Sequence, residues 1–594
     1  MAVKPIDIPI VGPSNNVPQD DPQRTLNFYA EKTGETWTLK PTPGADPYAA
    51  LGVNGGGRGA ISLGGRLFGV RGGFFQEIVN GVAIVRGTLL SNQNPVSIVG
   101  DKNAAIPSAT VTGQILIVDD DHGYVYEFED NRFTVLTEAT HGFVGGLSQA
   151  VFCGGYGVTI KPGTNQSGFS ALYNFLDWPG TNYIGLQNTV GNLVALASTG
   201  KSTTFFTDSG FEVWTTEGYT GAFAFTQIVS GFGIGCEAPR SVFTFNRFIY
   251  WLGGNEAGKG VVYRYTEGGT PTRLTDHSTE RQIAAISDPG DAIGYCYQSL
   301  GHTFYVLSFG VGNQTICYDS DTEQWHDRAW RDRITGFLFA VPYVAVIIHD
   351  GKLLGLDGRD GRFFHINDTV YTDDGAPIRR ERVLPVVPDE ADWMSYCSTV
   401  ELFSQVGSGE EVIETVVTEK VLGTTLASNP ILTNNQARYI YVGYYLDTNI
   451  WIAFAFNSSA ARASYLAGLN FEGFMGFATG EMTDSAQTVV IYNGASEELV
   501  SFTLEPVTTS SLPFTFDIVQ DIQTVVEYPQ VMMTYSANRG LTYGQEQWVK
   551  TAGNASYATR VRWTVGGAAF GFVFKFAIVA NVFVSWRSVR MVMQ

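Results

Sequence analysis

The residues best suited to chemistry in this sequence are its carboxylates and histidines. The run Asp119–His122 places three carboxylates beside an imidazole, and ligands of these types bind divalent metals. This run lies between two apolar segments, where a hairpin turn requires Asp and Gly. We therefore predict a turn there and no metal site. The seven histidines are scattered, and the sequence contains neither an HExxH nor a GxSxG motif.

A second candidate, Ser536–Tyr543, reads SANRGLTY and resembles the Asp-box of bacterial sialidases and other β-propellers, with Asn538 in place of the Asp. A glycosidase also needs a pair of carboxyl groups beside the scissile bond. Acidic residues are too numerous here to single out such a pair, and we interpret the cluster Asp389–Asp392 as a solvated loop. The box itself stabilises a hairpin, so we predict a hairpin at this position and no catalytic residue.

Glycine-rich and cysteine-based motifs give no cofactor. Gly231–Gly235 reads GFGIG, but no amphipathic helix follows, so the segment does not predict a nucleotide site. The five cysteines contain no CxxC pair, which argues against a zinc site or a disulfide framework and fits a reduced, cytosolic site of synthesis. We predict no cofactor, no metal and no enzymatic activity.

Composition and charge narrow the class of protein. Gly, Tyr and Phe are abundant, and the net charge of -20 disfavours free binding to nucleic acid, which needs Lys and Arg. The most apolar segment, Gly566–Trp586, is long enough to span a membrane. Its bulky residues alternate from Phe570 to Ile578, and this period of two predicts a strand instead. We predict no membrane span and no signal peptide.

A strand–turn–strand unit recurs along residues 61–370. Seven such segments begin at Gly64, Gly113, Ala150, Gly191, Asn246, Gly301 and Val344. Their spacing of roughly 35–55 residues is typical of the blades of a β-propeller. One small antiparallel sheet cannot bury both of its faces alone, whereas radial stacking buries them. The fold class that we predict is all-β, with a six- or seven-bladed β-propeller plus a C-terminal β-sandwich carrying an inserted module.

Composition also divides the rest of the chain. Residues 1–60 are rich in Pro, Asn, Asp and Gly, and we expect an extended N-terminal arm. Residues 371–407 and 527–594 are predicted to form the sandwich, interrupted by an acidic tip or docking module at 408–526. The interrupting segment carries thirteen acidic and three basic residues, whereas 531–594 has one acidic and seven basic residues. The last strands are therefore basic on an otherwise acidic chain.

Eight segments of the chain, in the same order, resemble the packaged-DNA stabilisation proteins of short-tailed bacteriophages, also called tail hub or nozzle proteins. The first two contain a QRTLNFY and a PTPG element, and the seventh contains the Asp-box-like hairpin. The segments are Gly12–Lys32, Leu39–Gly52, Thr207–Gly218, Phe223–Val242, Phe248–Tyr265, Pro271–Ile283, Ser536–Val549 and Tyr557–Gly567. The resemblance covers about 1–407 and 527–594, and residues 408–526 have no counterpart in it.

The resemblance implies a structural role in the virion tail. Such proteins form a homo-oligomeric ring, typically a hexamer, beneath the portal and its adaptor. The ring extends the channel for double-stranded DNA without sequence-specific binding, helps to retain the packaged genome, and provides attachment for tail fibres, spikes or a plug. The two alternatives from the residues are a propeller glycosidase or depolymerase of host surface glycans and a carbohydrate-binding adhesin.

Four residues are candidates for contacts with a neighbour. Gln23 and Arg24 lie in the predicted arm, and Arg560 and Arg562 lie on one face of a predicted basic strand. Residues of these types also serve as anchors within a single chain, so the sequence leaves both roles open.

Overall fold

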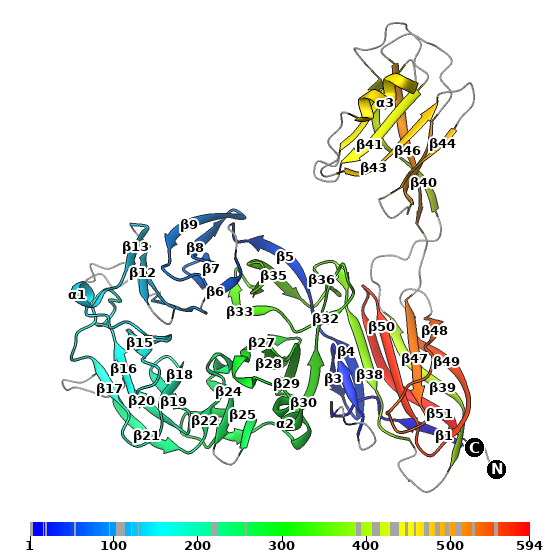
Figure 1. The fold of residues 1–594 in the computed structure, drawn as a ribbon. Helices are drawn as coiled ribbons and strands as arrows, with labels where there is room; N and C mark the ends of the chain where they lie inside the picture. Colours follow the sequence, from blue (N-terminus) through cyan, green and yellow to red (C-terminus); the bar gives the residue numbers. More distant parts are fainter. Residues whose placement is uncertain are drawn as a thin grey trace. The chain divides into compact units, whose positions relative to one another are not determined.

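The computed structural model describes an all-β chain, which confirms the predicted fold class (Figure 1). It describes residues 4–15, 17, 21–52, 55–93, 95–101, 113–119, 122–128, 130–216, 224–255, 258–387, 394–406, 529–551 and 556–593, and the helix and strands between 416 and 524. The chain forms two compact units, one of residues 1–410 and 528–594 and one of residues 411–527.

A ring of seven sheets forms the propeller within the described residues (Figure 1). The first sheet consists of β6(Gly57–Leu63), β7(Arg66–Arg71), β8(Phe74–Val79) and β9(Val82–Thr88). The second consists of β10(Ser97–Asp101), β11(Gln114–Val118), β12(Gly123–Glu127) and β13(Arg132–Val135). The third consists of β14(Gln149–Cys153), β15(Tyr156–Ile160), β16(Gln166–Phe169) and β17(Tyr183–Gly185). The short helix α1(Glu138–His141) joins the second sheet to the third.

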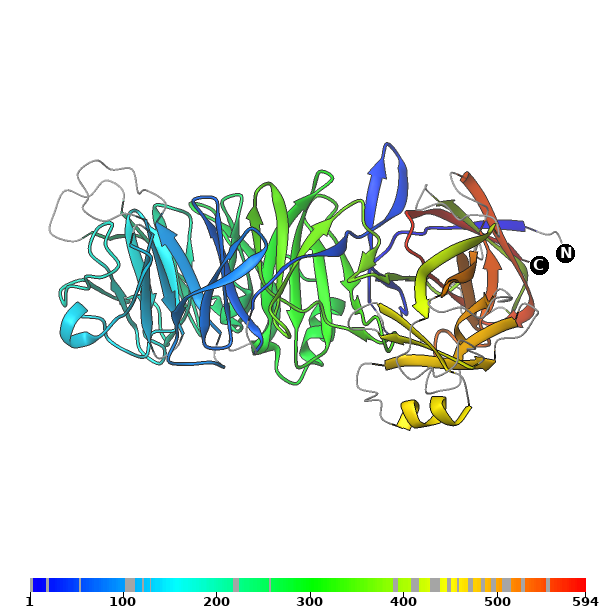
Figure 2. The ribbon, with the colours of Figure 1, turned by 90° about the horizontal axis from the view of Figure 1, so that it is seen from above.

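The next sheets continue the ring. The fourth consists of β18(Leu193–Ser198), β19(Ser202–Thr207), β20(Phe211–Thr215) and β21(Thr226–Phe232), and the fifth of β22(Gly235–Cys236), β23(Phe243–Phe245), β24(Phe248–Asn255), β25(Gly258–Thr266) and β26(Thr272–Arg273). After α2(His277–Ala284), the sixth begins with β27(Ile293–Ser299), β28(His302–Phe309), β29(Gln314–Asp319) and β30(Gln324–Arg328). A small hairpin of β31(Trp330–Arg331) and β32(Leu338–Phe339) precedes the seventh sheet. Figure 2 shows the blades from the edge of the disc.

The N-terminal strand β5(Gly44–Ala50) completes the seventh blade. It pairs antiparallel with β35(Arg362–Asn367), beside β34(Lys352–Asp357) and β33(Tyr343–His349), and β36(Thr372–Asp373) and β37(Ala376–Pro377) extend the sheet. Strand β33 contacts β6 of the first blade, so the ring closes between segments about 300 residues apart.

Aromatic side chains fill the spaces between blades, and tight turns connect strands within them. Phe68 and Phe75 of the first blade pack on Tyr126 of the second, with ring centroids 5.5 and 5.4 Å apart. Asn80–Gly81 and Asp350–Gly351 form two of the turns with positive φ that these residue types adopt at low cost. The repeated pattern of apolar strand and polar turn therefore produces stacked, closely packed sheets.

Two sheets form the C-terminal sandwich. Sheet 1 has the order β3(Phe28–Thr33), β4(Thr36–Pro41), β51(Val584–Met593), β39(Ser395–Val406) and β49(Ser556–Ala569), and β1(Lys4–Ile8) also pairs with β51. Sheet 2 has the order β2(Arg24–Leu26), β38(Arg379–Val383), β50(Val573–Val579), β47(Gln530–Ser536) and β48(Gln547–Lys550). The core between them contains Phe28, Phe574, Phe576 and Trp586, all buried.

Sheet 2 is continuous with the sixth blade, because β2 pairs parallel with β30 and antiparallel with β38. The propeller and the sandwich thus share one hydrogen-bonded sheet, which joins them through backbone as well as side chains. The predicted division into domains stays a prediction. The structure places the strands of the first sixty residues in the sandwich sheets, the seventh blade and, with β6, the first blade.

The unit of residues 411–527 contains one sheet and one helix in its described part. The strands have the order β40(Val416–Ala427), β46(Phe514–Thr524), β45(Glu498–Leu504), β44(Gln487–Tyr492), β43(Phe474–Glu481), β41(Tyr439–Tyr445) and β42(Ile450–Phe456), and α3(Ser459–Ala467) contacts β41 and β42. Every neighbouring pair in this sheet is antiparallel.

Candidate functional site

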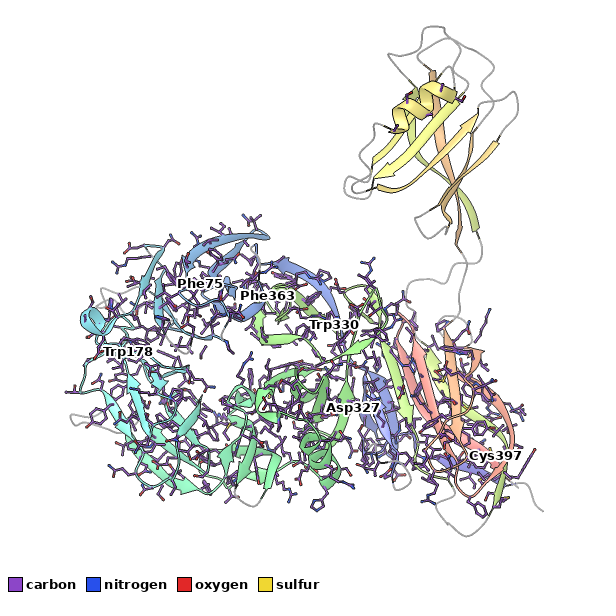
Figure 3. The ribbon with its side chains drawn as sticks, viewed as in Figure 1. Phe75, Trp178, Asp327, Trp330, Phe363 and Cys397 are labelled. Atoms are coloured by element: carbon purple, nitrogen blue, oxygen red, sulfur yellow. The ribbon has the colours of Figure 1, made fainter. Side chains whose placement is uncertain are left out.

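Gln23 and Arg24 lie at the junction between the sixth blade and the sandwich. Arg24 Nε donates to Asp327 Oδ2 at 2.7 Å, and its Nη1 lies 3.8 Å from Glu381 Oε1. Gln23 Oε1 accepts from Arg382 Nη2 at 2.6 Å. Asp327 belongs to β30, the strand of the sixth blade that faces the sandwich (Figure 3). Both candidates thus make contacts within the chain, and their binding to a neighbour stays a prediction.

Strand β38 carries a buried charged run that the sequence analysis did not select. Arg380 and Arg382 are fully buried, and burial lowers their pKa to about 10 and about 9. Arg382 Nη1 donates to Thr25 Oγ1 at 2.9 Å. Glu381, between them, lies within 4 Å of Arg24, Arg379 and Lys575, whose side chains are partly exposed. The four consecutive charges of residues 379–382 were the available signal, but their spacing is that of an ordinary exposed strand.

A small pocket of about 40 Å³ lies beside this junction. Arg328, Asp373, Tyr297 and Asn27 contribute polar groups to its lining. Burial raises the pKa of Asp373 to about 7, although Arg380 and Arg328 oppose that shift. The guanidinium of Arg328 lies 5.2 Å from the ring centroids of Tyr297 and Phe304, in cation–π contact with both. The junction therefore combines hydrogen bonds, ion pairs and cation–π contacts.

Arg560 and Arg562 have different surroundings from Gln23 and Arg24. They lie on β49 of sheet 1, and their side chains are 53% and 62% exposed. Their Nε atoms lie 3.6 and 3.7 Å from the two carboxylate oxygens of Glu401. Arg560 also lies over the ring of Phe403, 4.9 Å from its centroid. These two arginines, unlike Gln23 and Arg24, are available to a partner.

A pocket between the second, third, fourth and fifth blades is lined mainly by apolar residues. This pocket of about 270 Å³ is lined by residues of β10, β14, β18 and β23 and by the residue that precedes β23: Val99, Val151, Phe152, Leu196, Ala197, Ser198, Val242, Phe243 and Thr244. These lining residues include no carboxylate, guanidinium or imidazole. They offer neither the paired carboxyl groups of a glycosidase nor a site for an anionic sugar.

The Asp-box-like segment connects β47 to β48, which pair antiparallel as a hairpin, as predicted. Ser536 Oγ accepts from the backbone N–H of Gly540 at 2.9 Å, and Asn538 Oδ1 accepts from the N–H of Thr542 at 2.9 Å. Gly540 has a φ of 91°. These contacts stabilise the turn, and none of them involves a carboxyl group.

The remaining sequence candidates also have structural contacts where they are described. Asp119 Oδ1 accepts from the N–H of His122 at 2.8 Å, and its Oδ2 accepts from Tyr124 Oη at 2.9 Å. Residues 120 and 121 of that run, and the cluster at 389–392, lie outside the described residues. In the part of the chain that the structure describes, no group of three or more His, Cys, Asp or Glu side chains could hold a metal ion.

The apolar segment Gly566–Trp586, which is long enough to span a membrane, forms strands instead. Phe572, Phe574, Phe576 and Ile578 are buried in the sandwich core, and β50 pairs with β38 and β47. Among the described residues, no helix has both the length and the apolar character needed to cross a membrane. The predicted strand is confirmed over Val573–Val579, whereas Phe570 lies before it and is exposed, because β49 ends at Ala569 and a turn precedes β50.

Comparisons with known proteins identify two regions. Residues 48–370 match the family model of the bacteriophage P22 Gp10 β-propeller, and residues 508–594 match that of the bacteriophage P22 Gp10 β-sandwich. A search of the curated proteins finds no match. The first match alone covers more than half of the chain.

Several solved structures are similar to this chain at low identity. The N-terminal domain of Nup159 has a TM-score of 0.33 and 12% identity, and the match covers 58% of this chain and 98% of that one. The WD40 repeats of RRP9 have a TM-score of 0.34 and 9% identity, with 55% and 99% covered. PorZ, from the type-IX secretion system of Porphyromonas gingivalis, has a TM-score of 0.33 and 11% identity, with 78% and 66% covered.

Proposed function

The chain belongs to the bacteriophage P22 Gp10 family of packaged-DNA stabilisation proteins, and from this premise we propose that it is the hub, or nozzle, of a short phage tail. Its place is a ring of copies, typically six, below the portal and adaptor. There it extends the DNA channel, helps to retain the genome and provides attachment for fibres, spikes or a plug. The match to both family models, in chain order, is the observation that carries this proposal.

The junction between propeller and sandwich supports a mechanical role. A shared sheet and a buried network of arginines and carboxylates join the two parts into one body. A ring subunit that holds pressurised DNA needs such rigidity, because a flexible junction would let the channel wall yield. The acidic unit of residues 411–527 is the part that we assign to attachment of distal tail components.

The role needs no catalysis. We propose that the protein is not an enzyme and that DNA passes it without sequence-specific contacts. The net charge of -20 supports this, because an acidic surface repels phosphates and lets the duplex slide. The lining of the propeller pocket contains no carboxylate and so gives no support to a glycosidase.

The test uses a phage from which the gene for this chain is deleted, grown with or without the gene supplied in trans. We expect particles lacking the chain to lose packaged DNA and particles supplied with it to keep it, with density for a ring of this chain below the portal by cryo-electron microscopy. DNA retention without the chain, or its absence from purified tails, would contradict the proposal. Release of sugar from host surface glycans by the purified chain would favour the glycosidase.

A further inference from the structure

Strand β49 is the outer strand of sheet 1, and its outward face is basic. In the described residues it pairs with β39 and with no other strand. Its side chains alternate, since Val561 and Trp563 are buried while Arg560 and Arg562 are exposed. The strand therefore presents a row of arginines at an edge that no second described strand pairs with, and a sheet edge is where another strand can pair.

Charges alternate in sign across this face of sheet 1. The strand register places Arg562 opposite Glu401, Glu401 opposite Arg590, and Arg590 opposite Asp7. Arg590 Nε donates to Asp7 Oδ1 at 2.8 Å. Opposite charges on neighbouring strands stabilise a sheet, and like charges destabilise it. The row begins on β1 with a carboxylate and ends on β49 with a guanidinium.

The arginines at the end of this row are incompletely neutralised. Among the described residues, Arg560 and Arg562 share the carboxylate of Glu401, and both lie 3.6 Å or more from it, beyond ordinary hydrogen-bond distance. Arg590 approaches Phe403, 5.6 Å from its ring centroid, and so adds a third positive charge nearby. Carboxylates on one further strand would continue the alternation and give each arginine a partner.

The same arginines disfavour the pairing of two β49 strands in the register that would bring them together. An antiparallel pairing of two β49 strands centred on Val561 would place Arg560 of one copy opposite Arg562 of the other. Like charges directly opposite each other oppose such a symmetric contact. A heterologous contact, with two different surfaces, avoids this repulsion, and heterologous contacts are the ones that generate rings.

We propose that the β49 edge docks an extended acidic segment from a second copy of this chain. The inference rests on the proposed ring and names the contact that builds it. A second copy fits the chemistry because the chain has 57 acidic and 37 basic residues, so its neighbours present carboxylates. Duplex DNA fits less well, because Glu401 and Asp7 lie among the arginines and would repel phosphates, and DNA makes no use of a strand edge.

The first experiment measures self-association of the purified full chain by sedimentation. The test variant is the double charge reversal Arg560→Glu and Arg562→Glu. The control is the double charge reversal Arg281→Glu and Arg333→Glu, which changes the net charge equally at two exposed arginines of the propeller. We expect the first pair to weaken association about tenfold or more and the control pair to leave it near that of the unmodified chain. Association should also weaken between about 50 mM and about 500 mM salt.

Cross-linking identifies the partner surface. Arg560→Lys with Arg562→Lys keeps the charge and introduces amines that a carbodiimide joins to carboxylates in contact. In a mixture of isotope-labelled and unlabelled copies, we expect cross-links between a labelled peptide containing these positions and an unlabelled acidic peptide. Cross-links within single copies only, or a chain that stays monomeric, would overturn the proposal.

The alternatives give different results. If the arginines serve only to block edge pairing, Arg560→Thr with Arg562→Thr will increase association above that of the unmodified chain, and the proposal fails. The proposal also fails if charge reversal abolishes binding to a DNA duplex and leaves self-association unchanged. Normal tails assembled from the charge-reversed chain would overturn this inference while leaving the tail-hub function intact, whereas tails that never contain the unmodified chain would overturn that function.

Discussion

Two Arg-x-Arg runs in the sandwich have opposite environments. Arg380 and Arg382 on β38 are fully buried at the junction with the sixth blade, whereas Arg560 and Arg562 on β49 are more than half exposed. In both runs the spacing of two residues places the side chains on one face of a strand. The difference comes from what covers that face: Gly12, Gln23 and Thr25 contact the guanidinium of Arg382, whereas the described residues leave Arg560 and Arg562 more than half exposed.

The comparison shows that arginine side chains hold the fold together where they are buried and are available for binding where they are exposed. A buried guanidinium is expensive to desolvate and must be hydrogen-bonded, so the junction tolerates few changes. An exposed guanidinium costs little and contributes little to folding, which leaves it free to bind a neighbour. Substitutions that are chemically equal should therefore have unequal consequences at the two sites.

The largest difference is expected between Arg24→Met and Arg560→Met. Loss of Arg24 leaves the buried carboxylates of Asp327 and Glu381 without its charge, and we expect a loss of about 3 kcal/mol of stability near neutral pH. Loss of Arg560 should cost less than about 0.5 kcal/mol. Calorimetric unfolding of both variants measures the difference, and equal losses would contradict the contrast between the two sites.

The loss in Arg24→Met should also depend on pH. Burial already raises the pKa of Asp327, and the charge of Arg24 opposes that shift, so removing Arg24 raises this pKa further. A raised carboxyl pKa means that stability falls as pH rises through it, because the folded state then binds protons that the unfolded state has released. The deficit should be smaller at about pH 5 than at about pH 8.

The junction should become more stable when Asp373 is replaced by Asn. Its pKa of about 7 exceeds that of an unfolded aspartate, so its ionisation destabilises the folded chain progressively from about pH 4 to above pH 7. We expect Asp373→Asn to add about 2–4 kcal/mol at about pH 8 and almost nothing at about pH 4. Unfolding measured across this range tests the prediction, and a gain that is independent of pH would refute it.

A smaller effect is expected from Glu401→Gln on the exposed face. The change leaves Arg560, Arg562 and Arg590 without their shared negative charge, and we expect a loss of about 1 kcal/mol at low salt. Salt screens the repulsion among the arginines, so the deficit should narrow at high salt. Melting temperatures of the variant and the unmodified chain at both salt concentrations provide the check; a deficit that salt does not change would argue for lost packing instead.

Local features of the fold could be predicted from the sequence because they depend on neighbours along the chain. Alternation from Phe570 to Ile578 indicates a strand, and pairs such as Asn80–Gly81 and Asp350–Gly351 indicate turns. Contacts between distant segments carry no such signal. The residues of Gly44–Ala50 contain no pattern that predicts their pairing with Arg362–Asn367, which closes the ring.

The candidate site shows the same limit. Gln23 and Arg24 have the residue types of a contact surface, but their partners, Asp327, Glu381 and Arg382, lie more than 300 residues away and turn them inward. Arg380 and Arg382 escaped notice because RRER is also a normal sequence for an exposed strand. Burial is a property of the assembled sheets, and only the fold separates the two Arg-x-Arg runs.

The smallest effect is expected from Asn538→Asp, which restores the usual acid of an Asp-box on the same sandwich. Asn538 is exposed, its Oδ1 accepts from the N–H of Thr542, and its Nδ2 donates to Thr542 Oγ1 at 2.8 Å. An aspartate keeps the first bond, and the Thr542 hydroxyl can reverse the second by donating to the new oxygen. Stability should therefore change by less than about 0.5 kcal/mol, measured by calorimetry. A loss above about 1 kcal/mol would mean that the amide donor is needed. The hairpin has the same contacts with either residue, so Asn in place of Asp at position 538 is a neutral change in a structural turn. The arginines differ from it, because burial decides their role.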